Sequence, residues 1–182
     1  MTVHRRLLLL RGVNLAGTKK VSMADLRDLL GRIGCTDVAT LINSGNAVVS
    51  TPMSSPRRLA ASVEDAIGER FGFHVPVVVR TAAEMAAVKS GNPLVRDDRD
   101  PSRLLVTFFA DPPPGREAFE ALDLSPFAPH EFRLVGRELY AWYPDGLSKA
   151  PKTLPDVEKV LGSVRTARNW RTTLRLTDLL AR

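Results

Sequence analysis

The sequence predicts an α+β protein made of two ferredoxin-like subdomains in tandem, each an antiparallel sheet with helices on one face. Short apolar or alternating runs, typical of strands, and amphipathic segments, typical of helices, follow the order strand–helix–strand–strand–helix–strand. The second half repeats this order without residue-level identity to the first. Residues 91–101 are rich in turn residues and charges and predict a linker. We therefore expect subdomains at residues 1–96 and 97–182, the second with a terminal helix.

Four strands are predicted in the first half. The run of four leucines within residues 5–13 indicates a buried strand there. Residues 38–43 and 47–51 predict two strands joined by a hairpin at residues 44–46, whose glycine can adopt a positive φ. Residues 75–80 form another apolar run and predict the fourth strand.

The helices of the first half are marked by their ends. Ser22 is expected to cap a helix that Gly34 terminates, because a serine hydroxyl can accept a hydrogen bond from a first-turn amide. Ser55 caps a second helix with Pro56 at its first position, where the missing amide costs nothing, and Gly72 ends it.

A third helix and the second half follow. Thr81 and Glu84 form a capping box that predicts a helix reaching to about Ser90. In the second half we expect strands at residues 103–110, 131–135, 138–143 and 164–167, and helices around Phe119, from Thr153 to Leu161, and at residues 170–181.

Composition excludes several classes of protein. The 182 residues are 44% hydrophobic and 25% charged, which are ordinary globular values. No apolar run approaches the roughly 20 residues of a membrane helix, and the four leucines after Arg6 are too few for a secretory signal. A single cysteine, Cys35, excludes an internal disulfide and a zinc site built on several thiolates. We expect a cytoplasmic protein with no membrane association, no metal and no cofactor.

Positive charge is concentrated in the first half. Residues 1–96 hold 13 basic and 7 acidic side chains, whereas residues 97–182 hold 13 of each. This excess favours an anionic partner such as a phosphate, a nucleotide or a nucleic acid. Aromatic residues make up only 6% of the chain, so stacking surfaces for single-stranded nucleic acid are scarce. The alternative is a solvated, arginine-rich surface.

Five segments stand out along the chain: residues 9–17, 23–26, 41–49, 143–146 with 148–149, and 168–170. Together they resemble the bacterial domain-of-unknown-function family 1697, and the resemblance runs from residue 7 to about residue 176. The resemblance implies an α+β protein of two related subdomains and no established activity. Leu41 and Asn43 stand where the family usually has an aromatic residue and glutamine, and Ala167 and Arg171 where threonine and asparagine are common, so a polar site near the C-terminus is expected to be altered.

The stretch after the first strand suggests a phosphate site. Gly12 and Gly17 have the spacing of the two glycines in the phosphate-binding loop pattern. The next two residues, Thr18 and Lys19, differ from that pattern only in their order. That loop needs a helix that begins at the lysine, whereas the predicted helix starts after Ser22, so a looser anion site is the better hypothesis. The alternative is a connection whose glycines serve only the backbone shape.

The hairpin and the C-terminal segment hold further candidate donors. We expect the end of the first strand and the hairpin to lie at opposite ends of the sheet unless the hairpin is long. The alternative explanation of the hairpin's asparagines and glycine is that a tight turn requires these residues. Four arginines from Arg165 to Arg175 would align on one helical face and could bind an anion, but a helix beginning only at Trp170 aligns just two of them. The alternative is that these arginines form a solvated helix face. The candidate ligand-binding residues, expected to meet in a cleft between the subdomains, are Arg11, Asn14, Lys20, Asn43, Ser44, Asn46, Arg168 and Asn169.

No standard catalytic set is present. The three histidines lack metal-ligand spacing, Ser44 lies in a hairpin rather than a nucleophile elbow, and Cys35 has no marked base nearby. The first hypothesis is therefore a binding module for a small anionic ligand. An RNA-associated protein, which would need Phe108 or Phe109 exposed on a central strand, and an enzyme acting on a phosphorylated or acyl metabolite stay open. The sequence indicates no oligomeric state.

Overall fold

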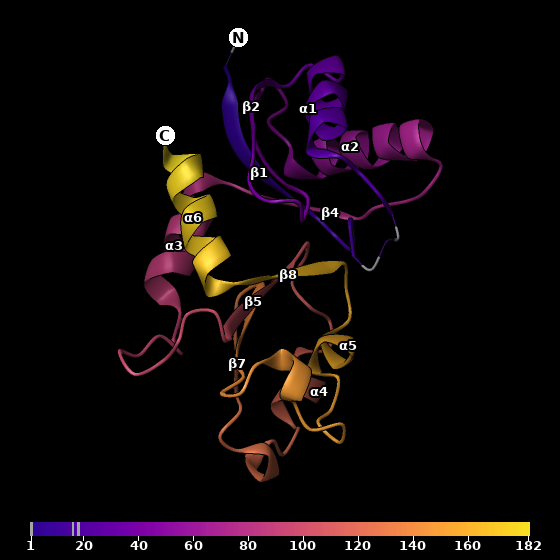
Figure 1. The fold of residues 1–182 in the computed structure, drawn as a ribbon. Coiled ribbons are helices and arrows are strands. Elements are labelled where there is room, and N and C mark those ends of the chain that lie inside the picture. Colours follow the sequence, from indigo (N-terminus) through magenta and orange to yellow (C-terminus); the bar gives the residue numbers. More distant parts are fainter. Residues whose placement is uncertain (1, 16, 18) are drawn as a thin grey trace. The chain divides into compact units, whose positions relative to one another are not determined.

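The computed structural model describes all residues except Met1, Ala16 and Thr18 (Figure 1). The chain divides into two compact units, one formed by Met1–Ala87 with Arg175–Arg182 and the other by Val88–Leu174. Within the described residues, no helix combines the length and the apolar character needed to cross a membrane.

The first unit contains a four-stranded antiparallel sheet in the order β2-β3-β1-β4. Helices α1 and α2 connect its strands, and together they give the ferredoxin-like order that the sequence predicts (Figure 1). The bounds are β1 (His4–Leu10), α1 (Met23–Arg32), β2 (Thr36–Thr40), β3 (Asn46–Thr51), α2 (Pro56–Phe71) and β4 (Val77–Arg80).

The second half of β1, residues 7–10, is apolar because both of its faces are buried. Leu8 and Leu10 belong to the core that the sheet forms with α1 and α2. Leu7 and Leu9 point to the opposite face, since side chains alternate along a strand, and they are also 0% exposed. On that face Arg5 donates to the carbonyl of Leu179 at 3.5 Å, in the C-terminal segment of the same unit.

The predicted helix ends of the first unit are confirmed. The Ser22 hydroxyl accepts a hydrogen bond from the amide of Asp25 at 3.0 Å. Ser55 caps α2 in the same way, and Gly72 ends it with φ +76°. The expected capping box opens α3 (Ala82–Gly91), where Thr81 and Glu84 exchange hydrogen bonds of 2.8 and 3.2 Å.

The second unit repeats this topology with its sheet in the order β6-β7-β5-β8. Phe109, Phe119 and Phe132 are central to the core that packs the two short helices on the sheet. Both Phe108 and Phe109 are 0% exposed, so neither provides the exposed aromatic side chain that the RNA hypothesis needs. The bounds are β5 (Leu104–Phe109), α4 (Arg116–Glu120), β6 (Glu131–Val135), β7 (Glu138–Trp142), α5 (Val157–Leu161), β8 (Arg165–Asn169) and α6 (Trp170–Ala181).

Several boundaries differ from the prediction; β2, for example, spans Thr36–Thr40 rather than residues 38–43. Strand β1 ends at Leu10 rather than at Val13, because the chain turns at Gly12, which has φ +68°. Helix α5 does not start at Thr153: the carboxylate of Asp156 accepts the amide of Lys159 at 2.9 Å and caps the helix there.

The expected linker, residues 91–101, is largely exposed, but two of its side chains are buried. Leu94 is 1% exposed and Arg99 is 9% exposed. The segment belongs to the second unit, which begins at Val88. The subdomain boundary after residue 96 stays a prediction.

Candidate functional site

The end of β1 and the β2–β3 hairpin lie together in the first unit. Leu9 pairs with Asn46, and the amide of Leu10 donates to the carbonyl of Gly45 at 2.9 Å. The expectation of opposite ends is therefore wrong: β1 and β3 are antiparallel, so the last residues of β1 face the first residues of β3. We call residues 11–21 and 41–46 the loop–hairpin end.

Asn14 joins the two parts of the loop–hairpin end. Its Nδ2 donates to the carbonyls of Val21 at 2.8 Å and Asn43 at 2.7 Å, and its Oδ1 accepts the amide of Val21 at 2.9 Å. Both Nδ2 hydrogens are thereby used, so the side chain of Asn14 positions the loop rather than supplying a free donor.

The carboxamide of Asn46 holds the hairpin itself. Its side chain is fully buried, and Nδ2 donates to the carbonyl of Leu41 at 3.0 Å and to the hydroxyl of Ser44 at 2.8 Å. Gly45 has φ +70° and lies directly on the end of β1. The two predicted donors Ser44 and Asn46 thus define the shape of the hairpin.

The loop–hairpin end carries positive charge without acidic neighbours in the chain. Residues 1–24 and 38–63 contain no aspartate or glutamate. Arg11 and Lys20 are exposed, and Lys19 donates from Nζ to a carbonyl of the segment before β4 at 2.8 Å. A cationic surface of this kind attracts anions. The seven cations of the two acid-free stretches are Arg5, Arg6, Arg11, Lys19, Lys20, Arg57 and Arg58.

Asp25, the first acidic residue along the chain, is already occupied. Its carboxylate accepts the Ser22 hydroxyl at 2.6 Å and a guanidinium hydrogen of Arg70 at 3.1 Å. These two hydrogen bonds lower the pKa of Asp25. The carboxylate therefore pairs with α2 and does not neutralise the loop–hairpin end.

We expect Asn14→Ala to lower the free energy of unfolding by about 2 kcal/mol, because the variant loses three hydrogen bonds. The hydrogen of the Val21 amide should exchange with solvent at least about tenfold faster, because lowering the free energy of local opening by about 1.4 kcal/mol raises the exchange rate tenfold. Asn43→Ala is the matched control, since Asn43 takes part through its backbone carbonyl. Equal effects of the two substitutions would contradict the role assigned to Asn14.

The candidate residues of the second unit have internal roles. Asn169 accepts the amide of Thr172 on Oδ1 at 2.8 Å and so caps α6. Arg168 lies on β8, where it donates to the hydroxyl of Thr166 at 2.7 Å, and burial lowers its pKa to about 10. Only Arg171 and Arg175 of the four spaced arginines lie on the helix. Convergence of Arg168 and Asn169 with the first-unit residues stays a prediction.

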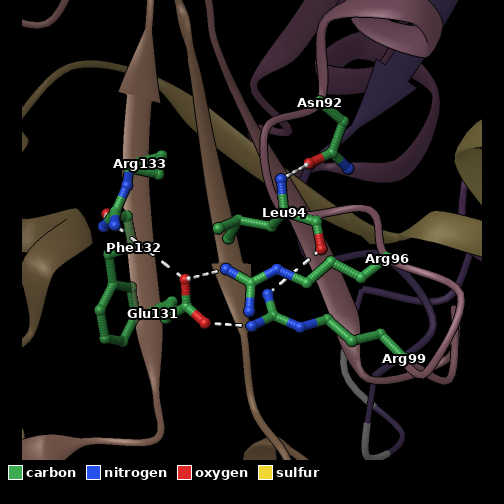
Figure 2. A network of polar contacts seen from close by, with 7 residues as sticks. All are labelled: Asn92, Leu94, Arg96, Arg99, Glu131, Phe132 and Arg133. Carbon is green, nitrogen blue, oxygen red and sulfur yellow. Dashed lines mark hydrogen bonds and ion pairs between the residues drawn. The ribbon is translucent and has the colours of Figure 1, made fainter.

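Sequence reasoning missed a cluster of three arginines around one carboxylate (Figure 2). Arg99, with its side chain 6% exposed, forms an ion pair with Oε1 of Glu131 and lies over the ring of Trp142 at 4.9 Å. Arg96 and Arg133 approach Oε2 of Glu131 at 3.4 and 4.0 Å. The charged segment is visible in the sequence, but its partner on β6 is not.

A second polar network anchors α5 on the sheet of the same unit. Oε1 of Glu158 accepts the hydroxyl of Thr107 at 2.8 Å, and Oε2 accepts Nε of Arg165 at 3.1 Å. Burial, followed by the charges of Glu158 and Asp156, raises the pKa of Tyr143 to about 12. Tyr143 is therefore a neutral core residue at ordinary pH.

No metal centre is formed by the residues that the structure describes, since no three histidine, cysteine or acidic side chains are grouped to hold an ion. Cys35 is buried, and burial raises the pKa of its thiol. A buried thiol with a raised pKa is a packing residue rather than a nucleophile. Thr18, part of the suggested phosphate loop, lies outside the described residues.

Comparisons with known proteins give a fold and a family. The structure of the conserved bacterial protein SP0830 from Streptococcus pneumoniae is similar, with a TM-score of 0.76 and 22% sequence identity over 98% of this chain and 99% of that one. The comparison with curated proteins gave no match. Residues 3–140 match the family model described as protein of unknown function, DUF1697. The chain therefore belongs to the DUF1697 family.

Proposed function

We propose that the protein is a cytoplasmic binding module for a small anionic ligand of the phosphate or nucleotide kind, held at the loop–hairpin end. Arg11 and Lys20 would supply the charge. The observation that carries the proposal is a loop with exposed cations at Arg11 and Lys20 that the hydrogen bonds of Asn14 tie to the hairpin.

Preorganisation strengthens such a site. A loop that is already tied to a hairpin loses little conformational entropy when a ligand binds, so more of the electrostatic attraction is available as affinity. Asn14, Ser44 and Asn46 act in this proposal as the frame, because their side chains bond within the loop–hairpin end. The charge comes from Arg11 and Lys20, and arginine is suited to planar contact with two phosphate oxygens.

The competing hypothesis of RNA binding through stacked bases has weaker support. A stacking platform needs aromatic side chains on an exposed strand face. Both phenylalanines of β5 are fully buried. The enzyme hypothesis has no named base, since the titratable groups Glu158 and Tyr143 are engaged in packing α5 and the core of the second unit.

The experiment compares two charge variants in the full chain. Inorganic phosphate and ADP are titrated, and amide chemical shifts are followed by NMR. We expect shifts confined to residues 11–21 and 41–46, and a Kd at least about tenfold weaker in Arg11→Ala, since a charge-assisted hydrogen bond contributes 1.5–3 kcal/mol. Arg32→Ala, which removes an exposed arginine of α1 paired with Asp28, is the control and should leave the Kd unchanged.

The salt dependence gives a second readout. Affinity should fall as ionic strength rises, because exposed charges are screened. If neither anion shifts the resonances of the loop–hairpin end, or if Arg32→Ala weakens binding as much as Arg11→Ala, this function is wrong.

A further inference from the structure

Two aliphatic side chains are exposed within the loop–hairpin end. Leu15 is 60% exposed and Ile42 is 47% exposed. Neither side chain belongs to the buried core of the first unit. Single exposed apolar residues are common, so their position beside the cations must carry the argument.

The backbone of Ile42 is unusual. Its φ is +50°, in the left-handed region, where a β-branched side chain is strained. Residues held in such conformations cost of the order of 1–3 kcal/mol and cluster at functional sites. Because the side chain is half exposed, burial returns little of this energy on folding. A polar residue or glycine would serve the turn at lower cost, so the isoleucine is best explained by a contact outside the folded chain.

Hydrogen bonds of Asn14 tie together the backbone next to these aliphatic residues and the backbone next to a cation. Leu15 follows Asn14 in the chain, and Ile42 precedes Asn43, whose carbonyl accepts Nδ2 of Asn14 at 2.7 Å. Lys20 precedes Val21, which forms two hydrogen bonds with the same carboxamide. Leu15, Ile42 and Lys20 are therefore each the chain neighbour of a residue that takes part in the hydrogen bonds of the Asn14 side chain.

We infer that the anion bound at the loop–hairpin end carries an apolar group next to its charge, and that its chemical class is a phosphate monoester of an aliphatic or aromatic alcohol. This inference rests on the proposed function. The phosphate pairs with Lys20 and Arg11, and the apolar group packs on Leu15 and Ile42. Inorganic phosphate would satisfy only the first of these contacts.

The test is a homologous series of soluble ligands titrated into the full chain. Inorganic phosphate, methyl, propyl and phenyl phosphate are compared by isothermal titration calorimetry. Each added methylene that reaches the aliphatic pair should tighten binding by up to about fourfold, the equivalent of burying one methylene. Leu15→Ser and Ile42→Thr should flatten the series and leave the Kd for inorganic phosphate within about twofold. Val3→Ser, at a residue that is also 60% exposed, is the control and should retain the slope.

The outcomes separate this inference from the proposed function. A flat series with measurable phosphate binding overturns the inference and leaves the function standing. Absence of any anion binding removes both. Vesicles of phosphatidylglycerol and of phosphatidylcholine form a further arm: sedimentation with the anionic vesicles, without binding of the soluble esters, would overturn the inference in favour of a lipid surface.

Discussion

The Gly45→Ala variant is expected to lose about 3 kcal/mol of the free energy of unfolding. A Cβ atom at this position would lie 2.5 Å from Cγ2 of Val13 and 2.7 Å from Cβ of Leu10, and the φ of +70° disfavours any side chain. Overpacking of this kind costs 1–3 kcal/mol, and the left-handed backbone adds to it. Because Leu10 is fully buried, the neighbours cannot move apart without disturbing β1.

Urea denaturation measures this effect, and Gly68→Ala supplies its control. Gly68 lies within α2 with open space at its Cβ position, so alanine there should stabilise the helix by about 1 kcal/mol. The folded Gly45→Ala protein should also bind phosphate more weakly, because the hairpin must move away from the loop. Unchanged stability would show that the hairpin does not pack on the end of β1.

The Glu131→Gln variant is expected to lose about 3 kcal/mol, because the Arg99 guanidinium then stays buried without its carboxylate. Arg96 and Arg133 also lose their shared partner and are left near one another (Figure 2). The measurement is the urea midpoint of unfolding of the second unit, followed through the fluorescence of its two tryptophans, Trp142 beneath Arg99 and Trp170.

An exposed ion pair and a double variant provide the controls. Glu120→Gln breaks the ion pair between Glu120, whose side chain is 59% exposed, and Arg116, whose side chain is 41% exposed. This substitution should change the free energy of unfolding by less than about 0.5 kcal/mol. Replacing both members of the buried pair, as Arg99→Met with Glu131→Leu, should recover much of the loss, since no unpaired charge remains buried. A double variant as unstable as Glu131→Gln would contradict the electrostatic explanation.

The fold could be predicted from the sequence because the residues that mark the ends of its helices act locally. A serine or a proline at a helix start and a glycine at its end act within one turn, so the ends of α1 and α2 could be assigned from a few letters. Helix α5 was placed too early because Asp156, rather than Thr153, offers the oxygen that caps it. Thr153 lies three residues further from the helix, in a stretch where proline interrupts the pattern.

The candidate site was only partly accessible because partners distant in the chain decide what a polar group does. Asn14 and Asn46 were chosen as donors, yet their carboxamides bond to the chain itself. The hairpin was placed at the wrong end because strand direction was not carried through to the pairing of β1 with β3. Arg99 lies in the segment that the sequence predicts as a linker, and nothing near it in sequence marks Glu131 as its partner.

The first unit is discontinuous, and this has a consequence for synthesis on the ribosome. Its sheet and both of its connecting helices are translated before residue 88, but Arg175–Arg182 belongs to the same unit. Leu176 and Leu180, both buried, and the carbonyl that accepts Arg5 emerge only after the whole second unit has been made. During synthesis the first sheet therefore forms before the C-terminal residues that complete its unit are available. A ribosome stalled near residue 170 would hold a nascent chain with exposed apolar surface, to which chaperones bind.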